Sequence, residues 1–168
     1  MARVLLTLAL LIGCGRAAGV SSFAVVVHPS NPNTNLRFAD VQAFFSGAAK
    51  QWPNSSFNGS LNSSLNRSKV VLVERDTASA AYQFLLARIL HTSASEYKRR
   101  LASIEFAGEA PVTIKILNSD QAACKFVFNV PGSIALIETN SLSLPECSGV
   151  GTVRIDGRLP SQEGYRLR

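Results

Sequence analysis

The segment Lys69-Val-Val-Leu-Val-Glu-Arg-Asp-Thr-Ala-Ser-Ala-Ala-Tyr-Gln-Phe-Leu-Leu-Ala-Arg-Ile-Leu90 predicts a strand, a short polar turn and an amphipathic helix in succession. Residues 70–73 are apolar and mostly β-branched, which is typical of a strand buried on both faces of a sheet. Beyond the turn, large apolar side chains recur at helical spacing, at Tyr82, Leu85, Leu86, Ile89 and Leu90.

The turn itself carries Arg75, Thr77 and Ser79 beside the free N–H groups of a helix start. A guanidinium, two hydroxyls and these N–H groups together predict a site for an oxyanion. The residues allow a second interpretation, in which Arg75 pairs with Asp76 or Glu74 and Ser79 only caps the helix. The local sequence leaves both open.

Length and composition indicate one globular domain. The chain has 168 residues, of which 46% are hydrophobic and 17% charged, and these values exclude disorder and a coiled coil. The net charge of +6 is compatible with several anionic partners. The basic residues are scattered, and the one dense run, Lys98-Arg99-Arg100, predicts a solvated helix face, so we expect no nucleic-acid binding.

The first 22 residues predict a signal peptide. Arg3 precedes the apolar run 4–12, which is too short to span a bilayer as a lasting helix. Leu11-Ile-Gly-Cys14 resembles a bacterial lipobox, in which Cys14 would carry the lipid, and ordinary cleavage around Ala17-Ala-Gly19 is the alternative. Either way we expect an exported protein of the periplasm or cell envelope, attached to the membrane only through such a lipid.

Cysteine usage fits export, because Cys124 and Cys147 remain as a pair for an oxidising compartment. We predict a disulfide between them, with two buried free thiols as the alternative. Four Asn-x-Ser sequons lie at Asn54, Asn58, Asn62 and Asn66. With a bacterial leader we interpret them as ordinary loop composition, within a long surface loop that begins at Trp52 and ends at Ser68.

The remaining chain alternates strands with helices. Strands are predicted at 23–27, 112–117, 133–137 and 152–155, and helices at 38–46, 95–107 and from Asn118 to about 130, with Gly47 ending the first helix and Asn118 with Gln121 opening the last. This alternation predicts an α/β domain with a mostly parallel sheet over residues 23–157, followed by a polar tail at 158–168.

Motifs for catalysis, metals and cofactors are missing from the sequence. His28 and His91 are isolated, and no nucleophile elbow, phosphate-binding loop or dinucleotide fingerprint occurs. We therefore expect no metal, no cofactor and no enzymatic activity. An exported hydrolase stays as a third hypothesis, which requires a Ser or Cys nucleophile near one of the two histidines.

A series of motifs resembles the phosphate-binding, periplasmic substrate-binding proteins of ABC transporters. The resemblance covers about Val25 to Gly157, and its order and spacing carry it more than any single motif. It rests on Val25-Val-Val-His-Pro-Ser-Asn-Pro32, Ala43-Phe-Phe-Ser-Gly47, Trp52-Pro-Asn54, Val71-Leu-Val-Glu-Arg75 with Ser79, Phe106-Ala-Gly108 and Pro131-Gly-Ser-Ile-Ala-Leu-Ile137.

The resemblance implies a type II periplasmic-binding-protein fold and capture of phosphate or a similar oxyanion for a membrane permease. Arg75 and Ser79 match an arginine and a serine that contact phosphate in larger members, whereas Ala80 and Ala81 replace the Gly and Thr that follow there. Thr77 is our candidate for the missing hydroxyl. The strand and Gly-rich loop that precede this region in full-length members have no counterpart before Val25, so we expect a fold reduced from two lobes to about one.

The leading hypothesis is thus an exported solute-binding domain that holds an oxyanion with Arg75, Ser79 and Thr77. The alternative is an envelope scaffold or accessory protein that keeps the fold without a ligand. The alternative predicts that Arg75 is engaged inside the protein and that another envelope protein is the partner.

Overall fold

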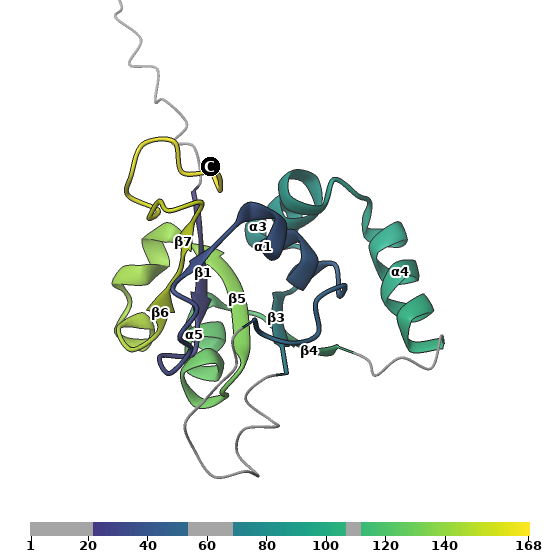
Figure 1. The fold of residues 1–168 in the computed structure, drawn as a ribbon, viewed down its shortest axis with the longest axis horizontal. Helices are drawn as coiled ribbons and strands as arrows, with labels where there is room; N and C mark the ends of the chain where they lie inside the picture. Colours follow the sequence, from purple (N-terminus) through teal and green to yellow (C-terminus); the bar gives the residue numbers. More distant parts are fainter. Residues whose placement is uncertain (1–21, 54–68, 107–111) are drawn as a thin grey trace, which may run out of the picture.

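The computed structural model describes residues 22–53, 69–106 and 112–168, shown in colour in Figure 1. Cys14 and the four sequons lie outside these residues, as do nearly all of the predicted signal peptide and most of the predicted surface loop. The longer elements are β1 (Phe23–Val27), α1 (Phe38–Phe45), β3 (Val71–Arg75), α3 (Ala80–Phe84), the π-helix η1 (Leu85–Leu90), α4 (Ala94–Phe106), β4 (Thr113–Leu117), α5 (Asp120–Asn129) and β5 (Ser133–Glu138).

The central sheet has the strand order β4-β3-β5-β1-β6, where β6 is Gly151–Thr152. Strands β4, β3 and β5 are parallel to one another, whereas β1 is antiparallel to both β5 and β6. A second, two-stranded sheet pairs β2 (Asn35–Leu36) with β7 (Arg154–Ile155). The predicted α/β fold with a mostly parallel sheet flanked by helices is confirmed.

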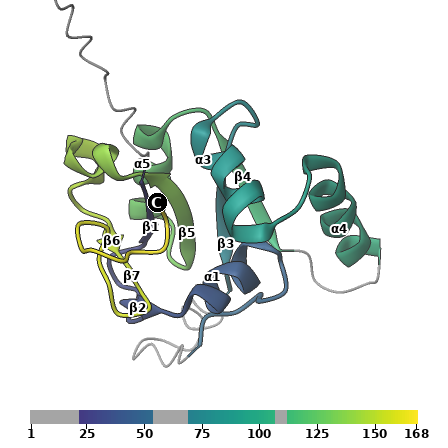
Figure 2. The ribbon, with the colours of Figure 1, turned by 90° about the horizontal axis from the view of Figure 1, so that it is seen from above.

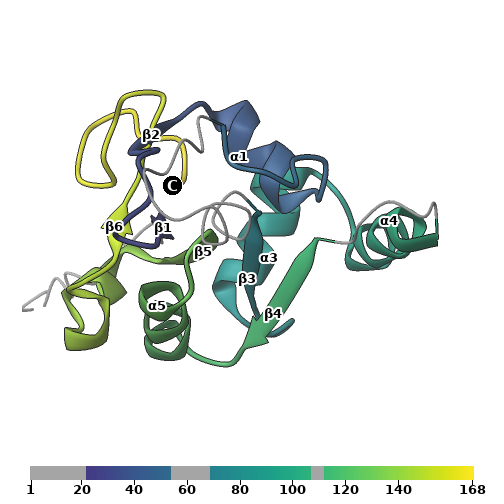
Figure 3. The ribbon, with the colours of Figure 1, turned by 60° about the horizontal axis from the view of Figure 1, so that its bottom comes forward.

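Alternating side chains of the strands fill two layers of core. Val25, Leu72 and Ile134 face α1, α3 and η1, while Val26 and Val73 face α5. Figure 3 shows α1 and α5 on opposite sides of the sheet. Because both faces of β1, β5 and most of β3 are covered, these strands are largely apolar, and this is why the run 70–73 predicts a buried strand.

Gly47 ends α1 as the sequence predicts, because it adopts a left-handed conformation with φ at +77°. Its Cα faces α4 closely, and a Cβ there would lie 3.2 Å from the Cδ1 atom of Ile104. Figures 1 and 2 show α4 standing at the margin of the molecule. Gly47 therefore both terminates one helix and makes room for the side chains of another.

Two expectations about surface residues are wrong. Trp52 was predicted to start a surface loop, yet it is buried, and its indole N–H donates to the carbonyl oxygen of Gly132 over 2.8 Å. The segment 158–168 is more than a polar tail, since Tyr165 and Leu167 belong to the core. The N–H of Phe23 donates to the Leu167 carbonyl oxygen over 2.8 Å, which ties this segment to β1.

Cys124 and Cys147 form the predicted disulfide. The bond joins α5 to the short 3-10 helix η3 (Pro145–Cys147), and both residues are buried in the core layer that α5 covers. The disulfide thus fixes the segment after β5 against the helix before it.

Candidate functional site

The β3–α3 turn lies where the parallel strands β3 and β4 end. Ser79 is the N-cap of α3: its Oγ accepts the N–H of Tyr82 at 3.2 Å and donates to the carbonyl oxygen of Asp76 at 2.7 Å. The hydroxyl hydrogen is therefore used within the turn. The capping role weighed in the sequence interpretation is present in the structure.

Arg75 crosses from the end of β3 to the segment that follows β4. Its Nε donates to the carbonyl oxygen of Leu117 at 3.3 Å, and Nη2 donates to that of Asn118 at 3.0 Å. Its Nη1 forms an ion pair and hydrogen bond with Asp120. Only 13% of the side chain is exposed. The guanidinium is thus fixed in one orientation at the carboxyl edge of the sheet.

Asp120 is the residue that sequence reasoning missed. Its carboxylate also accepts the hydroxyl of Ser141 at 2.6 Å and the N–H of Glu138 at 3.1 Å. Of the two predicted partners of Arg75, Asp76 lies 3.9 Å away. The other, Glu74, belongs to the opposite face of β3 because side chains alternate along a strand. One signal could have pointed to Asp120. The strands β3 and β4 are parallel and end at the same edge of the sheet, so the helix that begins after β4 starts close to Arg75.

The start of α5 differs by one residue from the prediction. Ser119, rather than Asn118, is the N-cap, and its Oγ accepts the N–H of Ala122 at 3.1 Å. Asn118 supplies a backbone carbonyl to Arg75 instead. This shift makes Asp120 the first residue of the helix, where a carboxylate is favoured by the helix dipole.

A cavity of about 280 Å³ opens beside the turn. Arg75 and Thr77 both line it, so the structure brings these two predicted residues together, whereas Ser79 is not among the lining residues. The other lining side chains come from β3, α3, α4 and β4: Glu74, Tyr82, Tyr97, Lys98, Leu101, Ile114 and Ile116. The site is a largely apolar recess, with Arg75 and Lys98 as its two basic lining residues.

Glu74 is a buried acid inside this recess. The hydroxyl oxygen of Tyr97 is hydrogen-bonded both to Oε1 of Glu74 and, at 2.9 Å, to the carbonyl oxygen of Phe45. A carbonyl oxygen only accepts and a phenol carries one hydrogen, so two contacts need a second hydrogen. A protonated carboxyl group of Glu74 would supply that hydrogen, with the Tyr97 hydroxyl donating to Phe45. Burial raises the pKa of Glu74, against a smaller lowering by Tyr97, which agrees with a neutral acid.

We expect Glu74→Gln to remove a pH dependence from stability. The pKa of Glu74 is raised in the folded state, so a protonated Glu74 stabilises the folded protein. This contribution is fully present below the ordinary pKa of 4.5 and is lost as the pH rises through the pKa of the folded state. Glutamine offers an amide hydrogen to Tyr97 at every pH. Denaturant unfolding at pH 5 and pH 8 should show the wild type losing more unfolding free energy than the variant.

The matched control is Glu163→Gln, which changes an exposed glutamate in the same way. This control should keep the pH dependence of the wild type. Equal pH dependence in wild type and Glu74→Gln would contradict a protonated Glu74.

His28 has a serine hydroxyl beside it, which is the neighbour that the hydrolase hypothesis requires. Within the described ranges, no group of three or more His, Cys, Asp or Glu side chains is placed to hold a metal ion. Nδ1 of His28 lies 2.8 Å from Oγ of Ser30 and accepts the N–H of the same residue at 3.1 Å. This exposed contact joins residues two apart and is also common in turns, so the hydrolase hypothesis stays a prediction.

Comparison with solved structures shows which proteins share this fold. The fold is similar to PstS from Borrelia burgdorferi (13% identity, TM-score 0.65, 88% of this chain and 54% of that one). It is also similar to an ABC-type phosphate transport receptor from Vibrio cholerae (18%, 0.63, 88% and 53%) and to a phosphate binding protein from Stenotrophomonas maltophilia (16%, 0.54, 83% and 40%).

These similarities confirm the predicted resemblance at the level of the fold. The chain spans about half the length of the first two of these proteins, which confirms a reduced version of their architecture. By sequence, the chain matches no family model and no curated protein. Among the described residues, no helix is long and apolar enough to cross a membrane.

Proposed function

We propose that this chain is a solute-binding domain that takes phosphate or a similar oxyanion at the β3–α3 turn. The proposal rests on how many N–H groups of the Arg75 guanidinium are already used inside the protein. Three of its five N–H groups are used, by Leu117, Asp120 and Asn118, which leaves one hydrogen on each terminal nitrogen. A guanidinium held in one orientation with two donors left suits a bidentate grip on an oxyanion.

The surroundings of the guanidinium supply further donors. Thr77 lines the same cavity, and the N–H groups of Ala80 and Ala81 lie in the first turn of α3, where a helix leaves its donors without intrahelical acceptors. The cap hydrogen bond of Ser79 goes to Tyr82 and leaves these two groups out. The solved relatives of similar fold are phosphate-binding proteins by description, which favours phosphate as the first ligand to test.

One observation favours the second candidate, an envelope scaffold that keeps the fold without a ligand. Asp120 and Asp76 both lie near Arg75, so the turn has two carboxylates for one guanidinium. An oxyanion would have to compete with Asp120 for Arg75 and would be repelled by both acids. Engagement of Arg75 inside the protein is what the scaffold hypothesis predicts.

Export, a lipid on Cys14 and an ABC permease as partner are parts of the same proposal. They follow from the leader sequence and from the resemblance, and each remains a prediction. In this proposal the domain works outside the cytoplasm and is attached to the membrane only through the lipid.

Isothermal titration with phosphate and with sulfate separates the two candidates. We expect the wild type to bind phosphate, and Arg75→Lys to bind it about tenfold more weakly, because lysine keeps a charge for Asp120 and loses the planar fork. Asp120→Asn should bind more tightly than the wild type, because it removes the competing charge. Arg37→Lys, at an exposed arginine beside Asp40, is the matched control and should bind as the wild type does.

Absence of heat with both anions on folded wild-type protein would refute the oxyanion proposal and leave the scaffold. Equal affinity in the wild type and Arg75→Lys would show that the anion binds elsewhere on the protein.

A further inference from the structure

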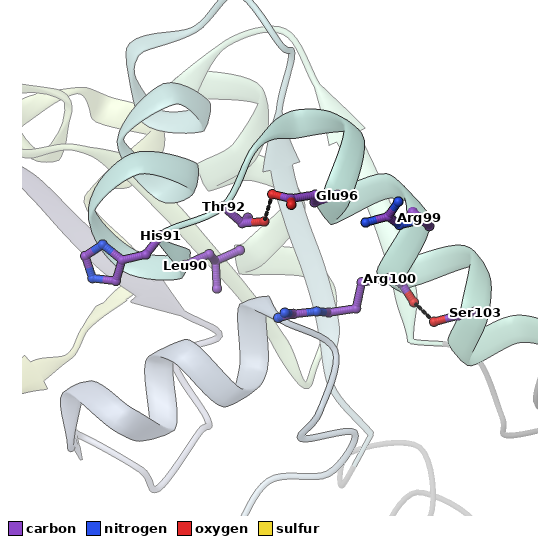
Figure 4. A pocket seen from close by; sticks show the side chains of 7 residues that line it. All are labelled: Leu90, His91, Thr92, Glu96, Arg99, Arg100 and Ser103. Atoms are coloured by element: carbon purple, nitrogen blue, oxygen red, sulfur yellow. Dashed lines mark hydrogen bonds between the residues drawn. The ribbon is translucent and has the colours of Figure 1, made fainter.

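A second and larger cavity, of about 580 Å³, lies at the junction between η1 and α4. His91 ends η1 in a left-handed conformation with φ at 49°, and the chain then turns into α4. Figure 4 shows Arg100 extending from α4 toward the end of η1, where Leu90 and His91 lie. The remaining lining residues are Thr92, Glu96, Arg99 and Ser103. None of these residues lines the recess beside the β3–α3 turn.

At the turn two carboxylates lie near one guanidinium, whereas this cavity has more arginines than carboxylates among its lining residues. Two arginines face one carboxylate, that of Glu96. The carboxylate is occupied by the N–H of Ser93 at 3.1 Å, the hydroxyl of Ser93 at 2.9 Å and that of Thr92 at 3.2 Å. These hydrogen bonds lower the pKa of Glu96, so it stays ionised as a cap of α4. No ion pair within 4 Å links Arg99 or Arg100 to a carboxylate of the described residues.

Of the arginine, serine and threonine side chains that line the cavity, the two arginines keep N–H donors for a ligand. The hydroxyl of Thr92 donates to Glu96, and that of Ser103 donates to the carbonyl oxygen of Arg100 at 2.7 Å, so neither has a hydrogen left for a ligand. Guanidiniums bind phosphoryl oxygens in pairs of parallel hydrogen bonds. Two arginines that line one cavity therefore suit a ligand with more than one phosphoryl group.

The volume and the lining narrow the ligand class. A cavity of this size is in the range of small-molecule sites, about 300–1,000 Å³, and is large for one free oxyanion. Leu90 is the single aliphatic side chain among its seven lining residues, so the cavity offers little to an apolar ligand. We propose that the cavity between η1 and α4 is a second anion site, which binds short phosphate chains through Arg99 and Arg100.

The proposal is tested by isothermal titration of the full chain with tripolyphosphate. The wild type should bind, and Arg99→Gln/Arg100→Gln should lose about tenfold in affinity for each guanidinium removed. The matched control is Lys115→Gln/Arg154→Gln, which removes the same charge from two exposed residues on β4 and β7. The control should retain wild-type affinity. Circular dichroism confirms that each variant is folded, which we expect because all four residues are exposed.

Three results would overturn the proposal: no binding of tripolyphosphate by the wild type, unchanged binding by the Arg99/Arg100 variant, or an equal loss in the control. Arg75→Lys is included in the same series and should bind tripolyphosphate as the wild type does. Absence of phosphate binding by the wild type, together with binding of tripolyphosphate, would therefore refute only the function proposed for the turn.

Discussion

Replacing Asp120 by alanine is expected to destabilise the protein by about 3–5 kcal/mol, the range found when one partner of a buried ion pair is removed. The change leaves the guanidinium of Arg75 without its counter-charge while 87% of that side chain stays out of contact with solvent. It also removes the acceptor of the Ser141 hydroxyl and of the Glu138 N–H. Denaturant unfolding followed by circular dichroism measures the loss.

Asp40→Ala is the comparison that isolates burial, because Asp40 pairs with the exposed Arg37 at 2.7 Å. Exposed pairs contribute about 0–1 kcal/mol. Asp40 also accepts the N–H of Arg37 as a cap of α1, which adds about 1 kcal/mol, so this variant should still lose clearly less stability than Asp120→Ala. Arg75→Ala/Asp120→Ala should cost less than the sum of the two single changes, since no unpaired charge remains. Equal effects of Asp120→Ala and Asp40→Ala would contradict a buried pair.

Removal of the disulfide is expected to cost about 3 kcal/mol, because Cys124 and Cys147 are 23 positions apart and their bond restricts the unfolded chain. Both residues are buried, so Cys124→Ala/Cys147→Ala also loses some packing of the layer under α5. The effect is measured as the drop in unfolding free energy of the double variant.

Wild-type protein with and without reductant provides the control, because reduction removes the cross-link and keeps the side chains. Reduction should account for most of the loss in the double variant. An unfolding curve unchanged by complete reduction, verified by thiol titration, would refute a stabilising role for the bond.

The sequence predicts the fold well where the signal is local. The apolar run 70–73, the helical spacing from Tyr82 to Leu90 and the stop at Gly47 all depend on neighbours within a few residues, and the structure confirms each of them. Trp52 and Leu167 were misjudged because their burial depends on distant segments. Trp52 is held by Gly132 and Leu167 by Phe23, and no local pattern announces either contact.

The candidate site shows the same division between local and distant information. The cap role of Ser79 is contained in the turn itself, whereas the partner of Arg75 comes from residue 120, across a strand pairing. Prediction of that partner requires knowing that β4 lies beside β3 and runs parallel to it. The basic run at 98–100 was correctly expected on an exposed face, but its relation to the end of η1 depends on how α4 packs.

The position of β1 in the sheet has a consequence for the order of folding. β1 is the first strand of the chain, yet its two neighbours are β5 and β6, at residues 133–138 and 151–152. More than a hundred residues must therefore be synthesised before β1 can pair with either neighbouring strand, and pairings between residues so far apart in sequence slow folding. Until then the apolar strand lacks its partners, and such an unpaired strand is prone to aggregation.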